Sequence, residues 1–368
     1  FDPTRPVRDA DAAYAPFGGY WTQLDGTGLQ KLAPKNPVAL LNQKEDISDV
    51  FRTISNLKID YKLHFLPELK LNVNLGYDYA SGKGTVVIPE NSSLGWQRYT
   101  LKQAGQPDVY KSGTNNAYDQ RKRSLLFDFY ANYVKELRSL KSRVDVMAGY
   151  SYQDWKTFVH NTPDYTYDKT LVSTPVYEYD YPQNTLVSFY GRLNYSLMDR
   201  YLFTATVRAD GSSRFSKENR WGVFPALALA WRMNQENFLK NVSWIDDLKL
   251  RLGYGVTGQQ NIGSDYSYFA SYTASKNYAY YPIGYGDGES YRPDAYNKNL
   301  KWERTTTYNA GVDYGFLNGR LTGSVDYYFR RTDDLINYVY VSAGTNFKNQ
   351  VNANIGSLEN KGVEFTIN

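Results

Sequence analysis

The sequence predicts an all-β protein that forms part of a transmembrane antiparallel β-barrel of the outer-membrane type. Three observations predict this fold class. Apolar and polar residues alternate with a period of two along many segments, and short and long connections alternate between those segments. Aromatic residues make up 16% of the 368 residues. Together these features describe the strands, the connections and the two interfaces of a barrel wall.

The alternation is clearest in one segment, where Val187, Phe189 and Leu193 fall on one face of a strand. The other face takes Ser188 and Arg192, because successive side chains of a strand point to opposite sides. We therefore expect the apolar face to meet lipid and the polar face to line the lumen. The predicted strands are 51–65, 69–78, 123–136, 143–158, 186–197, 201–210, 221–233, 248–257, 305–316 and 321–330.

The lengths of the strands and connections favour a membrane barrel over a soluble sandwich. The strands run to about 10–15 residues, whereas about 9–11 tilted residues suffice to cross a membrane. Short periplasmic turns and long extracellular loops are the plan of outer-membrane barrels. The short turns are predicted at 66–68, 138–141, 198–200, 234–245 and 317–319. The long loops are predicted at 80–122, 159–184 and 258–302, with a tighter connection at 210–219 that opens on an Asp210-Gly211 hairpin turn.

The composition supports the same fold and excludes several others. The chain has 36 Tyr, 17 Phe and 7 Trp, yet its mean hydropathy is negative. Rings with a polar tip suit the two membrane–water interfaces of a barrel. The best apolar run, 221–231, is too short for a membrane helix and contains Pro225. Cysteine is absent, which excludes disulfides and thiolate metal sites. The net charge of +4 is dispersed, and its one cluster, 121–123, is interpreted as a strand entrance, so we expect no nucleic-acid binding.

Catalytic and metal-binding constellations are not found in the sequence. His64 and His160 lie far apart without metal-ligand spacing, and His64 is expected to line the lumen or lie near a turn. The glycine-rich stretch 284–288 lacks the Lys-Ser/Thr of a phosphate loop. The acidic pairs 246–247 and 333–334 fall at strand edges, where solvated turn residues are expected. We predict no enzymatic activity, no metal and no cofactor.

Recognition chemistry is predicted only in the loops, which are rich in tyrosine. Aromatic planes with polar rims suit sugars or extended peptides. The alternative is that these rings pack loop against loop or belong to the interfacial girdle. The candidate substrate-binding residues are Trp96, Tyr165, Tyr167, Tyr278, Tyr280 and Tyr281.

Several long motifs in order resemble the barrel of the SusC/RagA-like TonB-dependent transporters of Bacteroidetes. The resemblance is close over 185–368 and looser over 1–184, where it begins at Asn36-Pro-Val-Ala-Leu-Leu41. The motifs that carry it are Ser188-Phe-Tyr-Gly-Arg-Leu-Asn-Tyr195, the stretch from Asp199 to Phe215, Asn219-Arg-Trp-Gly-Val-Phe-Pro-Ala226, Ala230-Trp-Arg232, Leu248 to Gly263, Asn299-Leu-Lys-Trp-Glu303, Gly323-Ser-Val-Asp-Tyr-Tyr328 and Asn354 to Glu364.

The resemblance implies a larger parent protein, a barrel of about 22 strands that is plugged by an N-terminal domain. It also implies a SusD-like surface lipoprotein as a lid and energy from TonB, ExbB and ExbD. Residues 1–368 are expected to be part of a single barrel domain, with the plug and the last strands outside this chain. Consistent with that expectation, residues 1–6 resemble the middle of a loop and 362–368 an unfinished strand.

The function implied by the resemblance is TonB-dependent import of a nutrient, an oligosaccharide or an oligopeptide, across the bacterial outer membrane. Two alternatives stay open. A passive porin would share the alternation but would need neither TonB nor a lid. A surface β-rich glycan-binding protein would have to bury its apolar strand faces between two sheets, since those faces would aggregate in water.

Overall fold

The computed structural model describes residues 2–26, 28–101, 107–274, 291–342, 344 and 348–368. The chain divides into two compact units. Unit 1 consists of Phe1–Ile54, Asp78–Arg123 and Lys156–Pro182, and unit 2 consists of Ser55–Tyr77, Ser124–Trp155 and Gln183–Asn368. The long strands that contribute residues to both units are β3 (Glu45–Lys62), β4 (Leu69–Ile88), β7 (Thr114–Leu137) and β8 (Ser142–His160).

The long strands of the described part of the chain belong to one sheet of 12 strands. The hydrogen-bonded order of the eleven long strands is β22-β19-β18-β15-β14-β13-β12-β8-β7-β4-β3, so that each long strand pairs with the next long strand along the chain. The twelfth strand, the short β11 (Tyr179–Asp180), pairs with β8 outside this order. The other long strands are β12 (Gln183–Leu197), β13 (Tyr201–Ser212), β14 (Trp221–Arg232), β15 (Ile245–Gln259), β18 (Glu303–Phe316), β19 (Leu321–Asp333) and β22 (Ser357–Ile367). This up-and-down antiparallel order confirms the predicted fold class, and each predicted strand is present.

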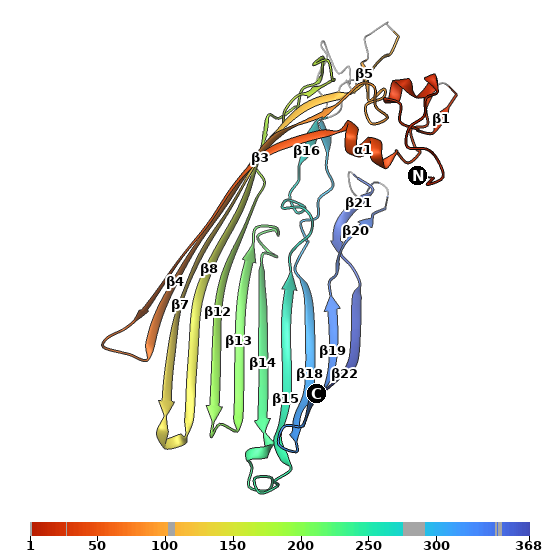
Figure 1. The fold of residues 1–368 in the computed structure, drawn as a ribbon. Coiled ribbons are helices and arrows are strands. Elements are labelled where there is room, and N and C mark those ends of the chain that lie inside the picture. The colour runs from red at the N-terminus through yellow and green to blue at the C-terminus, as the bar shows by residue number, and fades with distance from the viewer. Residues whose placement is uncertain (1, 27, 102–106, 275–290, 343, 345–347) are drawn as a thin grey trace. The chain divides into compact units, whose positions relative to one another are not determined.

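In unit 2, tight turns close one end of the sheet and long connections leave the other (Figure 1). The turn after β12 places Met198 and Asp199 at φ of 52° and 54°, in the left-handed region that reverses a chain sharply. The chain turns through the 3-10 helices η2 (Arg138–Leu140) after β7 and η3 (Met233–Gln235) after β14. The long connections contain the hairpins β16 (Tyr272–Ala274) with β17 (Tyr291–Pro293) and β20 (Ile336–Tyr340) with β21 (Gln350–Asn354). The predicted alternation of short and long connections is confirmed.

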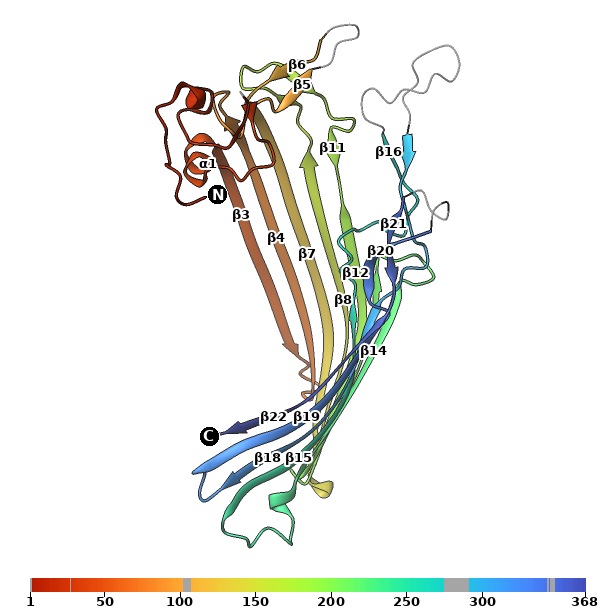
Figure 2. The ribbon, with the colours of Figure 1, turned by 90° about the vertical axis from the view of Figure 1, so that its right-hand side faces the viewer.

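In unit 1, an N-terminal segment precedes β3, and short strands lie in the connections at one end of the long strands (Figure 2). Asn36 starts the helix α1 (Pro37–Gln43) by accepting a hydrogen bond from the amide of Val38 at 3.1 Å. The Asn36 amide also donates to the carbonyl of Val7 at 2.8 Å, which ties the segment together. The other short elements are η1 (Ala12–Phe17), β1 (Leu24–Asp25), β2 (Gly28–Leu29), β5 (Tyr99–Leu101), β6 (Val109–Lys111), β9 (Asp164–Tyr165), β10 (Leu171–Ser173) and β11 (Tyr179–Asp180). Among the described residues, no helix has the length and apolar character needed to cross a membrane.

The two faces of the sheet differ as the alternation predicts. On one face, Leu229 pairs with Leu252, Leu227 pairs with Tyr254, and the three leucines are about half exposed. The opposite face carries charged residues such as Arg251. Large apolar side chains exposed on strands of membrane-spanning length are stable when lipid covers them.

The predicted hairpin turn at Asp210-Gly211 is wrong. Both residues lie inside β13, and the connection to β14 begins after Ser212. Gly211 pairs with Trp221, and a Cβ at Gly211 would stand 2.9 Å from the indole ring. The glycine is therefore needed to leave space for the indole ring and not to form a turn. The dipeptide Asp-Gly alone does not distinguish between these two roles.

Other predicted boundaries also shift. The loop predicted at 80–122 is shorter, because β4 continues to Ile88 and β7 begins at Thr114. The cluster 121–123 consequently lies within β7 rather than at its entrance. His64 lies in the turn that follows β3, which is the turn-proximal alternative for this histidine. The final segment is confirmed as a strand, β22.

Candidate functional site

An apolar cluster fixes the loops of unit 2 to the end of the sheet. The register between β14 and β15 ends at the pair Ala226 and Gly255, and the cluster begins beyond that pair. The ring of Trp302 lies with its centroid 5.3 Å from those of both Phe215 and Phe224. The buried members of the cluster are Phe215, Phe224, Val256, Ile262, Leu300 and Trp302. Two connecting loops thus share one small core with two strands, and that core sets where the loops start.

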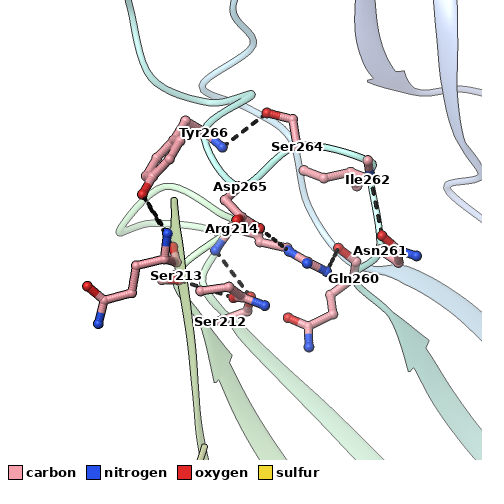
Figure 3. A network of polar contacts seen from close by, with 12 residues as sticks. Ser212, Ser213, Arg214, Gln260, Asn261, Ile262, Ser264, Asp265 and Tyr266 are labelled. Carbon is pink, nitrogen blue, oxygen red and sulfur yellow. Dashed lines mark hydrogen bonds and ion pairs between the residues drawn. The ribbon is translucent and has the colours of Figure 1, made fainter. Parts of the chain in front are cut away.

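Arg214 connects the β13–β14 loop to the β15–β18 loop (Figure 3). Its Nε donates to the Asp265 carboxylate at 2.9 Å, and its Nη1 donates to the Gln260 carbonyl at 3.4 Å. Both charged side chains are only about one-fifth exposed, at 20% for Arg214 and 21% for Asp265. Next to Asp265, the Tyr266 hydroxyl accepts from the Gln183 amide at 3.0 Å. Because these bonds reach three segments, the loops form one connected assembly.

Asparagine side chains attach the β20–β21 hairpin to the same assembly. The Asn352 amide donates to the Ser267 hydroxyl at 3.0 Å, and the Asn354 amide donates to the Lys301 carbonyl at 2.9 Å. In return, the Lys301 backbone amide donates to the Asn354 side-chain oxygen at 2.9 Å. An amide side chain that both donates to and accepts from one residue imitates a strand partner. We define the connections 213–220, 260–274, 291–302 and 334–356, as far as the structure describes them, as the loop assembly.

The polar face of β15, β18 and β19 carries a ladder of opposite charges. Lys249 and Arg251 both contact Asp313, at 2.9 and 2.7 Å, and Arg251 also contacts Asp326 at 2.9 Å. A Cβ at Gly311 would collide with the Asp326 carboxylate, so the glycine leaves space for the ladder. Two cations and two carboxylates neutralise one another, so the ladder itself is polar and carries no net charge.

A second polar group occupies the corresponding face of β7, β12 and β13. The Tyr190 hydroxyl donates to Asp128 at 2.6 Å. Arg208 donates to Asp210 at 2.7 Å and to the Ser188 hydroxyl at 2.7 Å. These side chains belong to the face that the sequence predicts to be polar, and all of their charges have partners.

Two of the predicted site residues, Trp96 and Tyr167, belong to segments of unit 1 that meet at Gly113. The Gly113 amide donates to the Gly95 carbonyl at 2.8 Å, next to Trp96, and a Cβ at Gly113 would stand 2.5 Å from the Cβ of Tyr167. The Trp96 ring itself lies 5.2 Å from the ring of Phe17 in an edge-to-face contact. Trp96 is therefore partly used in packing, whereas Tyr167 is 43% exposed.

Tyr165 is held by its backbone in the same part of unit 1. Its amide donates to the Asn116 side chain at 2.8 Å, and Asn116 in turn donates to Asp164 at 2.6 Å. Nearby, hydrogen bonds from Thr166, Lys111 and other donors hold the pKa of Asp168 well below its usual range. The loop that carries Tyr165 and Tyr167 is thus fixed by an ionised carboxylate at neutral pH.

The remaining predicted site residues, Tyr278, Tyr280 and Tyr281, lie outside the described residues. The sequence reasoning missed two exposed aromatics, Tyr338 and Tyr340, which are 59% and 77% exposed on β20. The alternation of Tyr338, Val339 and Tyr340 was a signal that could have found this strand. Within the described ranges, no group of three or more His, Cys, Asp or Glu side chains could hold a metal ion.

The other residues that the sequence singled out have neighbours that give them a structural role. Asp246, near the start of β15, accepts a hydrogen bond at 2.9 Å from the amide of Gly319, which lies in the turn between β18 and β19. Asp334 pairs with Lys301 at 2.8 Å. His160 stacks on Tyr179 at 4.9 Å. The stretch 284–288 lies outside the described residues.

The sheet is antiparallel, its strands are long enough to cross a membrane, and one of its faces is apolar and exposed. Its turns are short at one end and its loops are long at the other. These features together define the wall of an outer-membrane β-barrel. The comparison with known families agrees with that class. Residues 2–368 match the family model described as TonB dependent receptor-like, beta-barrel. The chain therefore belongs to this family, and it is located in the bacterial outer membrane.

Among curated proteins, the chain is 44% identical to the TonB-dependent receptor SusC of Bacteroides thetaiotaomicron, with 100% of the chain and 36% of SusC covered. It is 32% identical to the TonB-dependent receptor P39 of Formosa agariphila, with 93% of the chain and 32% of P39 covered. The chain thus spans about a third of the length of these curated relatives.

Among solved structures, the chain resembles the RagAB peptide transporter with a TM-score of 0.71, at 22% identity over 90% of the chain and 35% of the matched chain. It also resembles the siderophore receptor PirA from Acinetobacter baumannii with a TM-score of 0.51, at 16% identity over 87% of the chain and 42% of PirA. At these identities, the likeness shows the shared fold alone.

Proposed function

We propose that this chain is the C-terminal part of the barrel of a SusC-like importer, which takes up an oligosaccharide or an oligopeptide in a TonB-dependent way. The observation that carries the proposal is the 44% identity to SusC, which extends over the whole chain and includes the loop motifs. Wall residues alone would resemble any barrel of this family. The residues that build the loop assembly, such as Arg214, Phe215 and Trp302, belong to the motifs that resemble the SusC/RagA-like group.

In this proposal the chain contributes wall, lumen lining and extracellular loops, and it makes no bonds in the cargo. The parent would supply the plug and the contact with TonB, ExbB and ExbD. A SusD-like lipoprotein would close over the loops and capture cargo between itself and them. The charge ladder on β15, β18 and β19 carries no net charge, and this favours an uncharged or weakly charged cargo path along this part of the wall.

The experiment uses the full-length parent protein in its own bacterium. Uptake of labelled oligosaccharides and oligopeptides is compared between wild type, a strain without the parent and a strain without TonB. Uptake that needs both the parent and TonB supports an importer, and the cargo that is taken up identifies its class. Uptake that continues without TonB would establish the passive porin instead. Copurification of a lipoprotein with the parent in detergent tests the partner.

The aromatic loop residues are tested in the same assay. Trp96→Ala, Tyr165→Ala and Tyr167→Ala are each expected to reduce uptake roughly tenfold if their rings hold the cargo. The residues Tyr278, Tyr280 and Tyr281 are replaced as a group. Leu171→Ala is the control, because Leu171 is half exposed in the loop that carries Tyr165 and Tyr167 but has no aromatic ring. An equal effect of the control and the aromatic variants would contradict the assignment.

A further inference from the structure

A groove crosses the apolar face of β14, β15, β18 and β19 in unit 2. Its volume is about 450 Å³, which is within the range of sites that hold small ligands. We call it the wall groove. Strand pairing places its side chains in two adjacent rows, of which one consists of Leu229, Leu252, Ala310 and Tyr327 and the other of Leu227, Tyr254 and Tyr308.

The depression exists because a small side chain lies among large ones. Ala310 pairs with Leu252 on one side and with Tyr327 on the other, and its methyl group is much shorter than either neighbour. In the next row, the rings of Tyr254 and Tyr308 lie with their centroids 5.2 Å apart. Tyr308 is 51% exposed and Tyr327 is 48% exposed, so their rings form walls around the alanine.

The wall groove is continuous with the face that the membrane covers. Tyr308 precedes Phe316, at the turn end of β18, by eight positions. At the usual rise and tilt of barrel strands, eight residues reach about 20 Å along the membrane normal, whereas the apolar band is about 25 Å tall. The two tyrosines of the upper row therefore lie near the outer edge of the hydrocarbon, where lipids carry the ester groups that join chain to headgroup.

Two hydroxyl groups in the wall groove lack partners. Among the described residues, none forms a hydrogen bond with the hydroxyl of Tyr254 or Tyr308. By contrast, Tyr314 on the same face of β18 donates to the Thr366 carbonyl at 3.2 Å. A hydroxyl without a partner is costly in hydrocarbon, so what covers the groove has to bring acceptors. The apolar part of the groove alone selects little, because lipid tails are as apolar as leucine.

We infer that the wall groove binds a lipid with ester-linked acyl chains, specifically and from the outside of the barrel. One chain fills the depression over Ala310, and two ester carbonyls accept hydrogen bonds from the hydroxyls of Tyr254 and Tyr308. The lining residues carry no charge, so the ester linkage rather than the headgroup is recognised. This inference depends on the location in the outer membrane and not on the cargo of the importer.

The test measures lipid binding to the full-length parent in detergent by native mass spectrometry. The probes are a diester phosphatidylethanolamine and its diether analogue, which has the same headgroup and chains but no carbonyl acceptors. Wild type is expected to bind the ester about eightfold more tightly, at roughly threefold for each hydrogen bond inside a membrane. Tyr254→Phe/Tyr308→Phe keeps both rings and is expected to bind the two probes equally. The control Tyr314→Phe removes a hydroxyl from the same face outside the groove and is expected to keep the preference.

A second pair of variants tests the depression itself. Ala310→Leu fills it and is expected to weaken binding of both probes roughly tenfold. The matched control is Ala131→Leu, because Ala131 lies on the apolar face of β7, two positions after exposed Phe129, and is expected to bind as wild type does. Each variant must retain the heat-modified gel mobility of the folded barrel.

Three results would overturn the inference. In the first, wild type binds the ester and the ether equally. In the second, either control variant loses as much as its partner. In the third, a photocross-linker at position 310 captures a second copy of the protein instead of lipid. Capture of the ester lipid by that cross-linker, with its loss in Tyr254→Phe/Tyr308→Phe, would support the site.

Discussion

The Nε atom of Arg214 lies 2.9 Å from a carboxylate oxygen of Asp265, although the two residues are 51 positions apart in the sequence. This ion pair joins the connection after β13 to the connection after β15, and most of both side chains is shielded from water. Between them, the two connections carry Phe215 and Ile262 into the buried cluster. The pair therefore stabilises loops that the cluster has already placed side by side.

We expect Arg214→Ala to loosen the loop assembly. A hydrogen bond between charged groups with little solvent exposure contributes about 1.5–3 kcal/mol, and its loss leaves Asp265 without this cation. Hydrogen exchange in the full-length parent should therefore accelerate at least tenfold at 260–266 and remain unchanged in β18 and β19. Lys217→Ala is the matched control, because Lys217 is an exposed cation in the same connection. Unchanged exchange in Arg214→Ala would show that the apolar cluster alone holds these loops.

Two glycines on one pair of strands should respond differently to the same substitution. A Cβ at Gly311 would collide with the carboxylate of Asp326 and stand 2.9 Å from Arg251, whereas a Cβ at Gly253 would meet nothing closer than 3.7 Å. We expect Gly311→Ala to cost about 1–3 kcal/mol of stability, the usual range for overpacking, and Gly253→Ala to be nearly neutral. Urea unfolding of the parent barrel in detergent measures both. Equal stabilities of the two variants would show that the charge ladder shifts freely.

The strands of this protein could be predicted because their signal is local. Alternation over ten or more residues predicts both the presence of a strand and the face on which each side chain lies. It placed the ends of β12, β15 and β19 within a few residues. The alternation does not say where pairing ends, and so β4 and β7 extend further than the sequence indicated. Pairing at those ends depends on the neighbouring strand rather than on the local pattern.

The contacts that build the site could not be predicted from the sequence. Gly211 has the local pattern of a turn, but the ring of Trp221 explains it, and that ring comes from the next strand. Arg214 and Asp265 carry no signal that would join them across 51 positions. The six predicted aromatic residues were chosen by composition, which identifies rings but not which of them, like Trp96, are used in packing.

Removing the Phe224 ring should open a cavity at the base of the loops. Phe224 is 8% exposed and its ring packs against Trp302. We expect Phe224→Ala to destabilise the barrel by about 3–5 kcal/mol, the usual cost of emptying such a site. Val223→Ala is the control, since Val223 precedes it on the same strand but is 52% exposed on the apolar face. Thermal unfolding that shifts equally in both variants would contradict a core at this position.

At the turn end of unit 2, Glu236 accepts three hydrogen bonds. They come from the Tyr201 hydroxyl at 2.6 Å, the Trp231 indole at 3.1 Å and the Arg200 guanidinium at 3.2 Å. The rings of Tyr201 and Trp231 also stack on each other. The hydrogen bonds from Tyr201 and then Trp231, together with Arg200, hold the pKa of the Glu236 carboxyl below its ordinary value of 4.5.

This lowered pKa predicts how the stability of the turn depends on pH. Because the folded state favours the ionised carboxylate, the contribution of Glu236 is fully present above pH 4.5 and is lost as the pH falls through the lower pKa of the folded state. We therefore expect Glu236→Gln to lower the unfolding temperature of the parent at pH 7 and pH 5, with the difference from wild type shrinking as the solution is acidified below 4.5. Glu218→Gln, in an exposed loop position, should show no difference at any of these pH values. If the difference in unfolding temperature between Glu236→Gln and wild type stayed constant as the pH was lowered, the charge of Glu236 would not be what stabilises the turn. The shape of the side chain would then be responsible.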